Sequence, residues 1–153
     1  MKINLIFFLP NFSEGGAGKS IMKICNNLNN LKYTITIISI FKCFYKKQFK
    51  RNIKFYELKQ KKTFLSFFKI SKILNKNYPS QNTIFISNMN YVNVLACIFL
   101  KFILNYKLVL IERTPLKELK IFYNFNEIFK KKIIYMLMKL LYRFSDKVIV
   151  NSF

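Results

Sequence analysis

The residues best suited to chemistry lie in a glycine-rich turn near the amino terminus. All three glycines of the chain, Gly15, Gly16 and Gly18, stand directly after an apolar run of strand length, and a helical pattern follows them. The first amides of a helix direct unpaired N–H groups and about half a positive charge at whatever lies before them. Glycines at this point let a ligand approach the backbone closely. The opening segment therefore predicts an anion site, most often one for phosphate, at the edge of a parallel sheet.

The same turn partly matches the phosphate loop of nucleotide hydrolases. Lys19 and Ser20 follow a glycine as the G-x-x-x-x-G-K-[ST] pattern requires, but Ser13 stands where the pattern has its first glycine. Such an enzyme also needs a carboxylate after an apolar strand to hold magnesium. The single aspartate, Asp146, precedes a strand, and Glu112 would be a second departure. A phosphate-loop nucleotide-binding protein and a plain strand-to-helix turn both stay open as alternatives.

Polar residues also follow two other predicted strands. Glu112 and Arg113 could bind sugar hydroxyls or a phosphate, although an internal salt bridge that fixes the loop is the more frequent arrangement. Ser87 and Asn88 could do no more than cap the next helix. Asn93 falls inside that helix, where asparagine is a poor helix former. We therefore keep Asn88, Asn93, Glu112 and Arg113 as candidates for binding.

The longest helical pattern covers positions 127–144. Its apolar residues stand at 129, 133, 136, 137, 140, 141 and 144, and its basic residues at 130–132, 139 and 143. A helix of this kind can lie on anionic lipid. More often it packs its apolar side on the core and exposes its basic side. The pattern therefore predicts packing, with weak membrane contact left open.

The elements that must position these residues alternate in type. Apolar or β-branched runs predict strands over 3–9, 33–40, 53–58, 83–87, 107–112 and 147–150. Helical spacing predicts helices over 19–31, 64–75, 91–104 and 127–144, with a loop over 42–52 and an irregular segment over 113–126. This order predicts an α/β domain, Rossmann-like and doubly wound, with a mostly parallel sheet and helices on both faces. Ligands of such sheets bind beyond the carboxyl ends of the strands, where strand order reverses.

Composition limits the possible functions. The 153 residues, 52% of them hydrophobic, can form one domain with a core. There is no histidine, and the three cysteines are scattered, which speaks against a metal site, a disulfide framework or a Cys/His or Ser/His catalytic pair. The free thiols predict a reducing, cytoplasmic compartment. The amino-terminal apolar stretch, about seven residues long and without a cleavage site, is too short for a signal peptide, and no run of about 18 apolar residues predicts a membrane span.

The chain is strongly basic, with a net charge of +21 from 27 basic and 6 acidic residues. Such a charge implies an anionic partner: nucleic acid, anionic lipid or a phosphorylated substrate. Abundant Lys, Asn, Ile and Phe are also expected of a coding sequence rich in A and T, so part of the charge can be compositional drift. A basic module that binds anionic lipid or nucleic acid is thus a second alternative function. Because the phenylalanines lie in apolar runs typical of a core, nucleic acid is not expected.

Several motifs, taken in order, resemble the N-terminal domain of glycosyltransferase family 4. They are FLPNFSEGGA at 8–17, NNL at 26–28, TITII at 34–38, ISNMNYVN at 86–93, IERT at 111–114 and LYRFSDKVIVNS at 141–152. The resemblance covers essentially the whole chain, and the order and spacing of the motifs make it fairly specific. It implies one half of a GT-B fold, in which this acceptor-side domain faces a donor-binding domain across a cleft.

The resemblance also implies an activity. Family members are typically retaining enzymes without a metal requirement, which transfer a sugar from a nucleotide-sugar donor to a glycan or lipid-linked acceptor. The nucleotide sugar is a substrate, and no cofactor is implied. The expected setting is cell-surface polysaccharide or glycolipid synthesis in the cytoplasm or on the inner face of the membrane, as a peripheral protein.

The resemblance extends to individual residues. Gly15 and Gly16 match a turn that lies against the donor diphosphate and the acceptor, and Lys19 belongs to the same loop. The acceptor or rim positions are Asn88, Asn93, Glu112 and Arg113, and no residue is assigned to catalysis. The sequence departs from the family in that Gly18-Lys19-Ser20 replaces the usual Glu-Arg or Glu-Lys. The donor-binding domain, with its basic pair and two spaced glutamates, has no counterpart in the 153 residues. We therefore expect a truncated or split enzyme that is inactive without a separate C-terminal domain chain.

Overall fold

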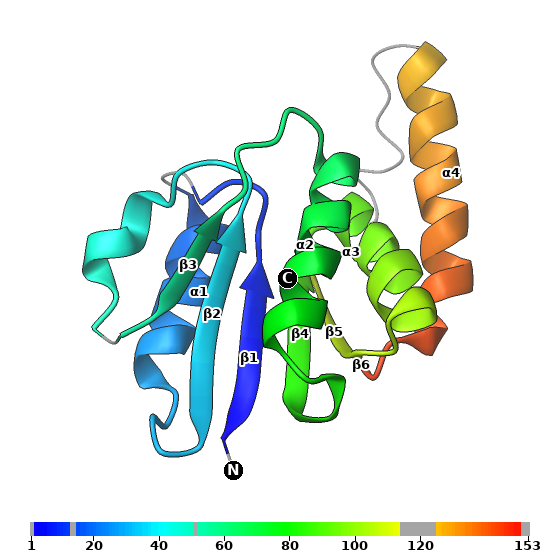
Figure 1. Cartoon of the computed structure of the whole chain (residues 1–153). Coiled ribbons are helices and arrows are strands. Elements are labelled where there is room, and N and C mark those ends of the chain that lie inside the picture. Colours follow the sequence, from blue (N-terminus) through cyan, green and yellow to red (C-terminus); the bar gives the residue numbers. More distant parts are fainter. Residues whose placement is uncertain (1, 13–14, 51, 114–124, 151–153) are drawn as a thin grey trace.

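The computed structural model describes residues 2–12, 15–50, 52–113 and 125–150, with the side chains of 125 and 126 excepted. Within these ranges six strands form one parallel sheet in the order β3-β2-β1-β4-β5-β6. The strands are β1 (Ile3–Phe8), β2 (Tyr33–Ser39), β3 (Lys54–Glu57), β4 (Thr83–Asn88), β5 (Lys107–Glu112) and β6 (Lys147–Val150). Helices flank both faces of the sheet (Figure 1), so the predicted Rossmann-like α/β architecture is confirmed. The sheet is parallel throughout rather than mostly parallel.

The helices differ from the predicted ranges mainly at their ends. The α-helices are α1 (Gly16–Asn27), α2 (Thr63–Asn77), α3 (Asn90–Ala96) and α4 (Phe125–Leu141). Short 3₁₀ segments are η1 (Phe44–Gln48), η2 (Ser80–Asn82) and η5 (Tyr142–Phe144), and η3 (Cys97–Ile103) is π-helical. The segment predicted as a loop over 42–52 therefore contains a 3₁₀ turn. The single helix predicted over 91–104 changes its hydrogen-bonding pattern at its midpoint.

Helix α1 begins at Gly16 rather than at the predicted Lys19. Gly15 caps it with extended backbone (φ −146°, ψ 161°), and the Gly15 carbonyl accepts a hydrogen bond from the Lys19 amide at 3.1 Å. That bond is the first i to i−4 bond of the helix. Gly16 and Gly18, which were expected to lie in the turn before the helix, therefore belong to the helix itself. Lys19 consequently lies within the helix.

The sheet separates two apolar layers. On one face, Ile21 and Cys25 of α1 are buried beside Phe7 of β1. On the other, Phe67 of α2 packs edge-to-face on Phe8 of β1, with ring centroids 5.5 Å apart. Successive side chains of a strand point to opposite faces, so β1 is apolar in nearly every position because helices cover it on both sides.

The direction of winding reverses between β1 and β4. The chain builds β1, β2 and β3 outward in one direction, then returns through α2 to place β4 on the other side of β1. The carboxyl ends of β1 and β4 therefore lie side by side, and the Asn88 side-chain amide donates to the Phe8 carbonyl across them at 3.4 Å. In open α/β sheets this is the position where ligands bind.

Helix α4 packs on α3, as its pattern predicted, but of the seven apolar positions in that pattern only Leu137 and Leu141 take part. Met138 is buried against Val94, with Ile134 and Leu141 beside it. The other apolar positions, namely Phe129, Ile133, Met136, Leu140 and Phe144, are exposed. The expectation that these five would face the core is wrong, because the helix carries two apolar stripes and only one meets α3.

No helix in the described ranges is both long and apolar enough to cross a bilayer.

Candidate functional site

The candidate site lies at the carboxyl edge of the sheet, where α1 begins beside the ends of β1 and β4. Gly15 and Gly16 are both exposed there. No described glycine has a positive φ, and a Cβ added to Gly16 would meet no atom of the described residues within 4 Å. Neither backbone conformation nor packing therefore requires glycine at position 16. The space around this Cα is open among the described residues, so a ligand has room to approach the backbone here.

The first turn of α1 is electrostatically suited to an anion. It contains no acidic residue, and no side chain of a described residue caps it. The hydroxyl of Tyr45, in η1, donates to the Gly15 carbonyl at 3.4 Å. This bond anchors the turn through a carbonyl group and engages none of the helix amides. Among the described residues, the positive end of the helix dipole therefore has no anionic partner.

Arg113, directly after β5, reaches from there to α1. Its Nε donates to the Asn88 side-chain oxygen at 3.3 Å, and its Nη2 donates to the Ser20 hydroxyl at 3.3 Å. Both acceptors are neutral, and among the described residues no carboxylate lies within ion-pair distance of this guanidinium. Burial lowers the pKa of Arg113 from its usual value. A partly buried cation with neutral partners is suited to receive an anion.

Glu112 does not pair with the Arg113 side chain, as the salt-bridge interpretation of this motif would require. Its Oε1 accepts from the Arg113 backbone amide at 3.1 Å, and its Oε2 accepts from the Tyr142 hydroxyl at 2.8 Å. The carboxylate is buried, with 5% of the residue exposed. Burial and the neighbouring carboxylate raise the pKa of Tyr142, so the hydroxyl stays protonated and donates. Glu112 is therefore held beneath the edge of the sheet.

The two predicted asparagines are fully buried. Asn93 donates to the Ile111 carbonyl at 3.1 Å and accepts a hydrogen bond from the Ser87 hydroxyl. It joins α3 to the ends of β4 and β5 from the interior, where a buried amide is satisfied by bonds within the protein, and its predicted contact with a ligand stays a prediction. Asn88 lies at the edge, where it joins β1 to Arg113. It positions the guanidinium.

The backbone at this edge is also unusual at Met89, between β4 and α3. Met89 has φ 83° and ψ 140°, a backbone conformation that residues other than glycine rarely adopt. Its amide donates to the Ile111 carbonyl at 3.3 Å. Such a conformation costs of order 1–3 kcal/mol. Strained backbone of this kind gathers at ligand sites, which agrees with the position of Met89 beside Asn88.

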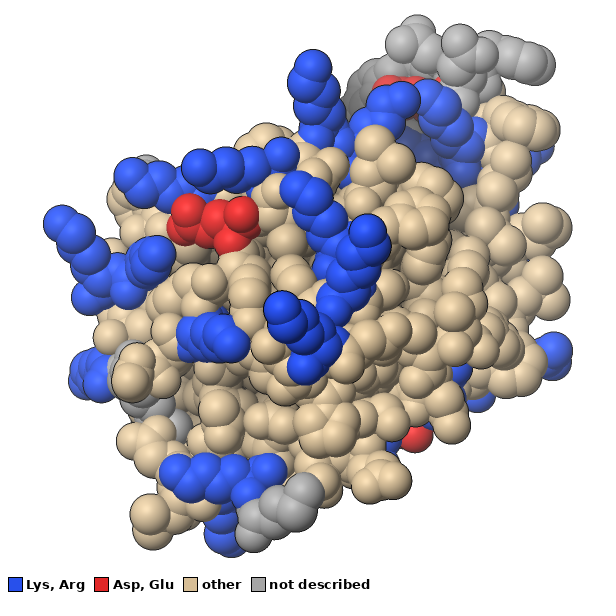
Figure 2. All heavy atoms as spheres, in the orientation of Figure 1, with Lys and Arg blue, Asp and Glu red and all other residues tan. Residues whose placement is uncertain are grey.

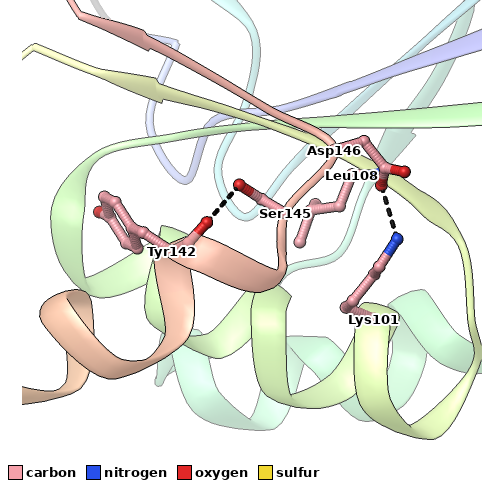
Figure 3. A network of polar contacts seen from close by, with 5 residues as sticks. All are labelled: Lys101, Leu108, Tyr142, Ser145 and Asp146. Carbon is pink, nitrogen blue, oxygen red and sulfur yellow. Dashed lines mark hydrogen bonds and ion pairs between the residues drawn. The ribbon is translucent and has the colours of Figure 1, made fainter.

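The turn that carries Tyr142 is fixed by a separate polar network, shown in Figure 3. The Asp146 carboxylate accepts from the Lys101 ammonium at 2.7 Å and from the Leu108 amide at 2.8 Å. The Ser145 hydroxyl donates to the Tyr142 carbonyl at 2.7 Å (Figure 3). These bonds hold η5 against η3 and β5. They thereby set the direction from which Tyr142 reaches Glu112.

Ser20 and Tyr142 were not among the predicted site residues. Both occur inside quoted motifs, but each meets its partner from far along the chain: Ser20 and Arg113 are 93 positions apart. The predicted Lys19 is exposed on α1 next to Ser20.

Among the described residues, no group of three or more His, Cys, Asp or Glu could hold a metal ion.

A hollow of about 240 Å³ lies at the opposite, amino edge of the sheet, where β1, β2 and β3 begin. Its lining residues are Lys2, Asn30, Tyr33, Thr34, Ile35, Asn52 and Ile53. It is separate from the glycine turn and from Arg113, so it does not form part of the candidate site.

The motifs at this edge come from four elements that the fold brings together. In the described part of the chain they supply a helix start without a side-chain cap, a guanidinium with neutral partners and a buried carboxylate. Comparison with protein-family models gave no match for this chain, and comparison with curated proteins gave none either.

Proposed function

We propose that this domain is the acceptor-side half of a nucleotide-sugar-dependent glycosyltransferase, and that its carboxyl sheet edge holds a phosphate-bearing group of the substrates. The observation that carries the proposal is the Arg113 guanidinium, held by Asn88 and Ser20 and without a carboxylate partner among the described residues. It stands beside α1, whose first turn contains Gly16 and has no side-chain cap among the described residues. A guanidinium and a helix start together attract a phosphate or diphosphate.

Sugar transfer fits this arrangement because the reaction creates negative charge. As the bond between the anomeric carbon and the diphosphate oxygen breaks, its electrons pass to the leaving diphosphate. The acceptor hydroxyl oxygen forms the new bond to that carbon, and its proton passes to the leaving diphosphate. Positive groups near the diphosphate stabilise this charge. The resemblance to glycosyltransferase family 4 supports the same assignment, with the donor held by a second domain across the cleft.

The same resemblance supports the proposed setting. The acceptor would be a glycan or a lipid-linked sugar, and the reaction would belong to cell-surface polysaccharide or glycolipid synthesis at the inner face of the membrane. Glu112 is buried and accepts from Tyr142 and from the Arg113 amide, so the role we propose for it is to support the edge of the sheet beside Arg113 rather than to contact the acceptor.

A phosphate-loop nucleotide-binding protein is less well supported by the geometry. In a phosphate loop, backbone N–H groups around the lysine surround the phosphates, and the following hydroxyl binds magnesium. Here the Lys19 amide already donates to the Gly15 carbonyl, and the Ser20 hydroxyl accepts from Arg113. Both groups are therefore occupied within the protein.

The first prediction tests the anion site by titration calorimetry of the full chain with uridine diphosphate and with inorganic pyrophosphate. Arg113→Gln should weaken binding of both ligands about tenfold or more, because a charge-assisted hydrogen bond contributes about 1.5–3 kcal/mol. Arg113→Lys should weaken binding less, since it keeps the charge but loses the planar fork.

Arg143→Gln is the matched control, because it removes an equal charge from an exposed arginine of η5. Equal losses in Arg113→Gln and Arg143→Gln would show attraction by the overall charge and contradict the assigned site. ATP binding that Lys19→Ala abolishes and Arg113→Gln leaves intact would favour the phosphate-loop function.

A further inference from the structure

The outward side of α4 carries an apolar stripe at helical spacing. It contains Phe129, Ile133, Met136 and Leu140, and it continues to Phe144 of η5, with 67%, 37%, 54%, 47% and 41% of these residues exposed. Intervals of three and four residues place them on one face of a helix. The opposite side of α4 already packs on α3 through Met138. The exposed stripe is therefore additional to the surface that the core needs.

The stripe extends onto the neighbouring π-helical segment. The rings of Phe144 and Phe102 meet edge-to-face with centroids 5.0 Å apart, and Phe102 and Ile103 of η3 are themselves 53% and 65% exposed. We call the combined surface, made of these two residues and the five of the stripe, the outer ridge. Large apolar side chains that adjoin on a surface mark an interaction site, whereas single ones do not.

Basic side chains border the outer ridge. Lys132, Lys139 and Arg143 follow one side of the stripe on the helix and Lys130 the other, and all four are exposed. The Arg143 guanidinium lies 4.8 Å from the Phe144 ring, so a positive charge adjoins the apolar surface directly. Figure 2 shows a broad surface without charged residues over the α3 and α4 side of the molecule, with lysine and arginine side chains at its borders.

We propose that the outer ridge docks on an anionic membrane surface, with α4 lying in the interfacial plane. Such an interface offers apolar chains to the ridge and negative headgroups to the flanking cations, as interfacial helices require. A second copy of this chain would bring another net charge of +21 against the same cations. A nucleic acid would match the charge but would leave the apolar stripe in water. The membrane is the partner that satisfies both properties.

The test is co-sedimentation of the full chain with vesicles of phosphatidylcholine mixed with phosphatidylglycerol, and with vesicles of phosphatidylcholine alone. We expect binding to the anionic vesicles. The triple variant Phe129→Ser, Met136→Ser, Leu140→Ser should lower the partition coefficient at least about tenfold, since each side chain removed from water contributes favourably. The control Leu31→Ser, Phe41→Ser changes exposed apolar residues remote in sequence from the ridge and should bind like the unchanged chain.

A second pair of variants separates charge from apolar contact. Lys132→Gln, Lys139→Gln, Arg143→Gln should lose binding to anionic vesicles, whereas Lys23→Gln, Lys42→Gln, Lys47→Gln, with the same loss of charge from the first third of the chain, should lose much less. Circular dichroism melting verifies that each variant is folded. The proposal is overturned if the unchanged chain ignores anionic vesicles, if the ridge variants bind as well as their controls, or if light scattering without lipid shows a dimer that the triple serine variant dissociates.

Discussion

At the residue scale, Arg113 and Gly16 each differ from their ordinary structural role. A partly buried arginine is usually paired with a carboxylate, yet Arg113 contacts an amide oxygen and a hydroxyl. A glycine beside a turn is usually required by a positive φ or by a close neighbour, yet Gly16 has neither within the described part of the chain. Both residues lie at the switch point of the sheet. Their combination indicates a ligand more strongly than either residue does alone.

Gly16→Ala separates a binding role from a structural one. Because the added Cβ meets nothing and α1 gains a better helix former, the free energy of unfolding should stay the same or rise by about 0.4–1 kcal/mol. Binding of uridine diphosphate should nevertheless weaken about tenfold, since the Cβ would occupy space before the helix. Urea unfolding and calorimetry measure the two quantities. A stable variant with undiminished affinity would contradict the assignment of this turn to the ligand.

At the element scale, the position of η5 and the start of β6 depends on Asp146. Although burial opposes it, the hydrogen bond and charge of Lys101 and the Leu108 amide lower the pKa of Asp146 below its usual value. The ionised form is therefore preferred in the folded state, and this carboxylate also fixes the turn that orients Tyr142 (Figure 3). A contact remote from the site thus supports Glu112 through Tyr142.

Asp146→Asn should lower the melting temperature at neutral pH. The sign of the pH dependence follows from a lowered pKa: the stabilisation is complete above the unfolded value, about 3.9, and is lost as the pH falls through the folded value. The difference in melting temperature between the two proteins should therefore shrink below about pH 4. Calorimetric melts from neutral to acid pH measure it. A difference that is constant across this range would show that the ion pair is not the cause.

At the scale of the whole molecule, two surfaces of different chemistry share one domain. The glycine turn and Arg113 lie at the carboxyl edge of the sheet, and α4 begins on that same side of the molecule (Figure 1). If the outer ridge docks on a membrane, the candidate site lies near the lipid surface, where a lipid-linked acceptor would be found. The surplus of positive charge then serves attraction to the membrane at a cost in stability through self-repulsion.

This self-repulsion gives a prediction for the whole chain. With a net charge of +21, raising the sodium chloride concentration from low to physiological values should raise the melting temperature, because the screening length falls to about 8 Å. Scanning calorimetry at several salt concentrations measures the trend. Sucrose at matched osmolality is the control for general solvent effects, and a melting temperature that falls with salt would show that attractive ion pairs dominate.

The sequence by itself determined the order and type of the elements. Strand patterns such as 107–112 and helical spacing such as 64–75 are local, and alternation of the two requires a parallel sheet. The tertiary structure alone decided which of two apolar stripes on α4 is buried, that Asn93 lies in the interior, and that Ser20 meets Arg113. The spacing of apolar residues predicts whether a segment is a helix or a strand and which of its faces is apolar. Which surface, and which distant polar group, depends on the strand order, and that order is a property of the whole sheet.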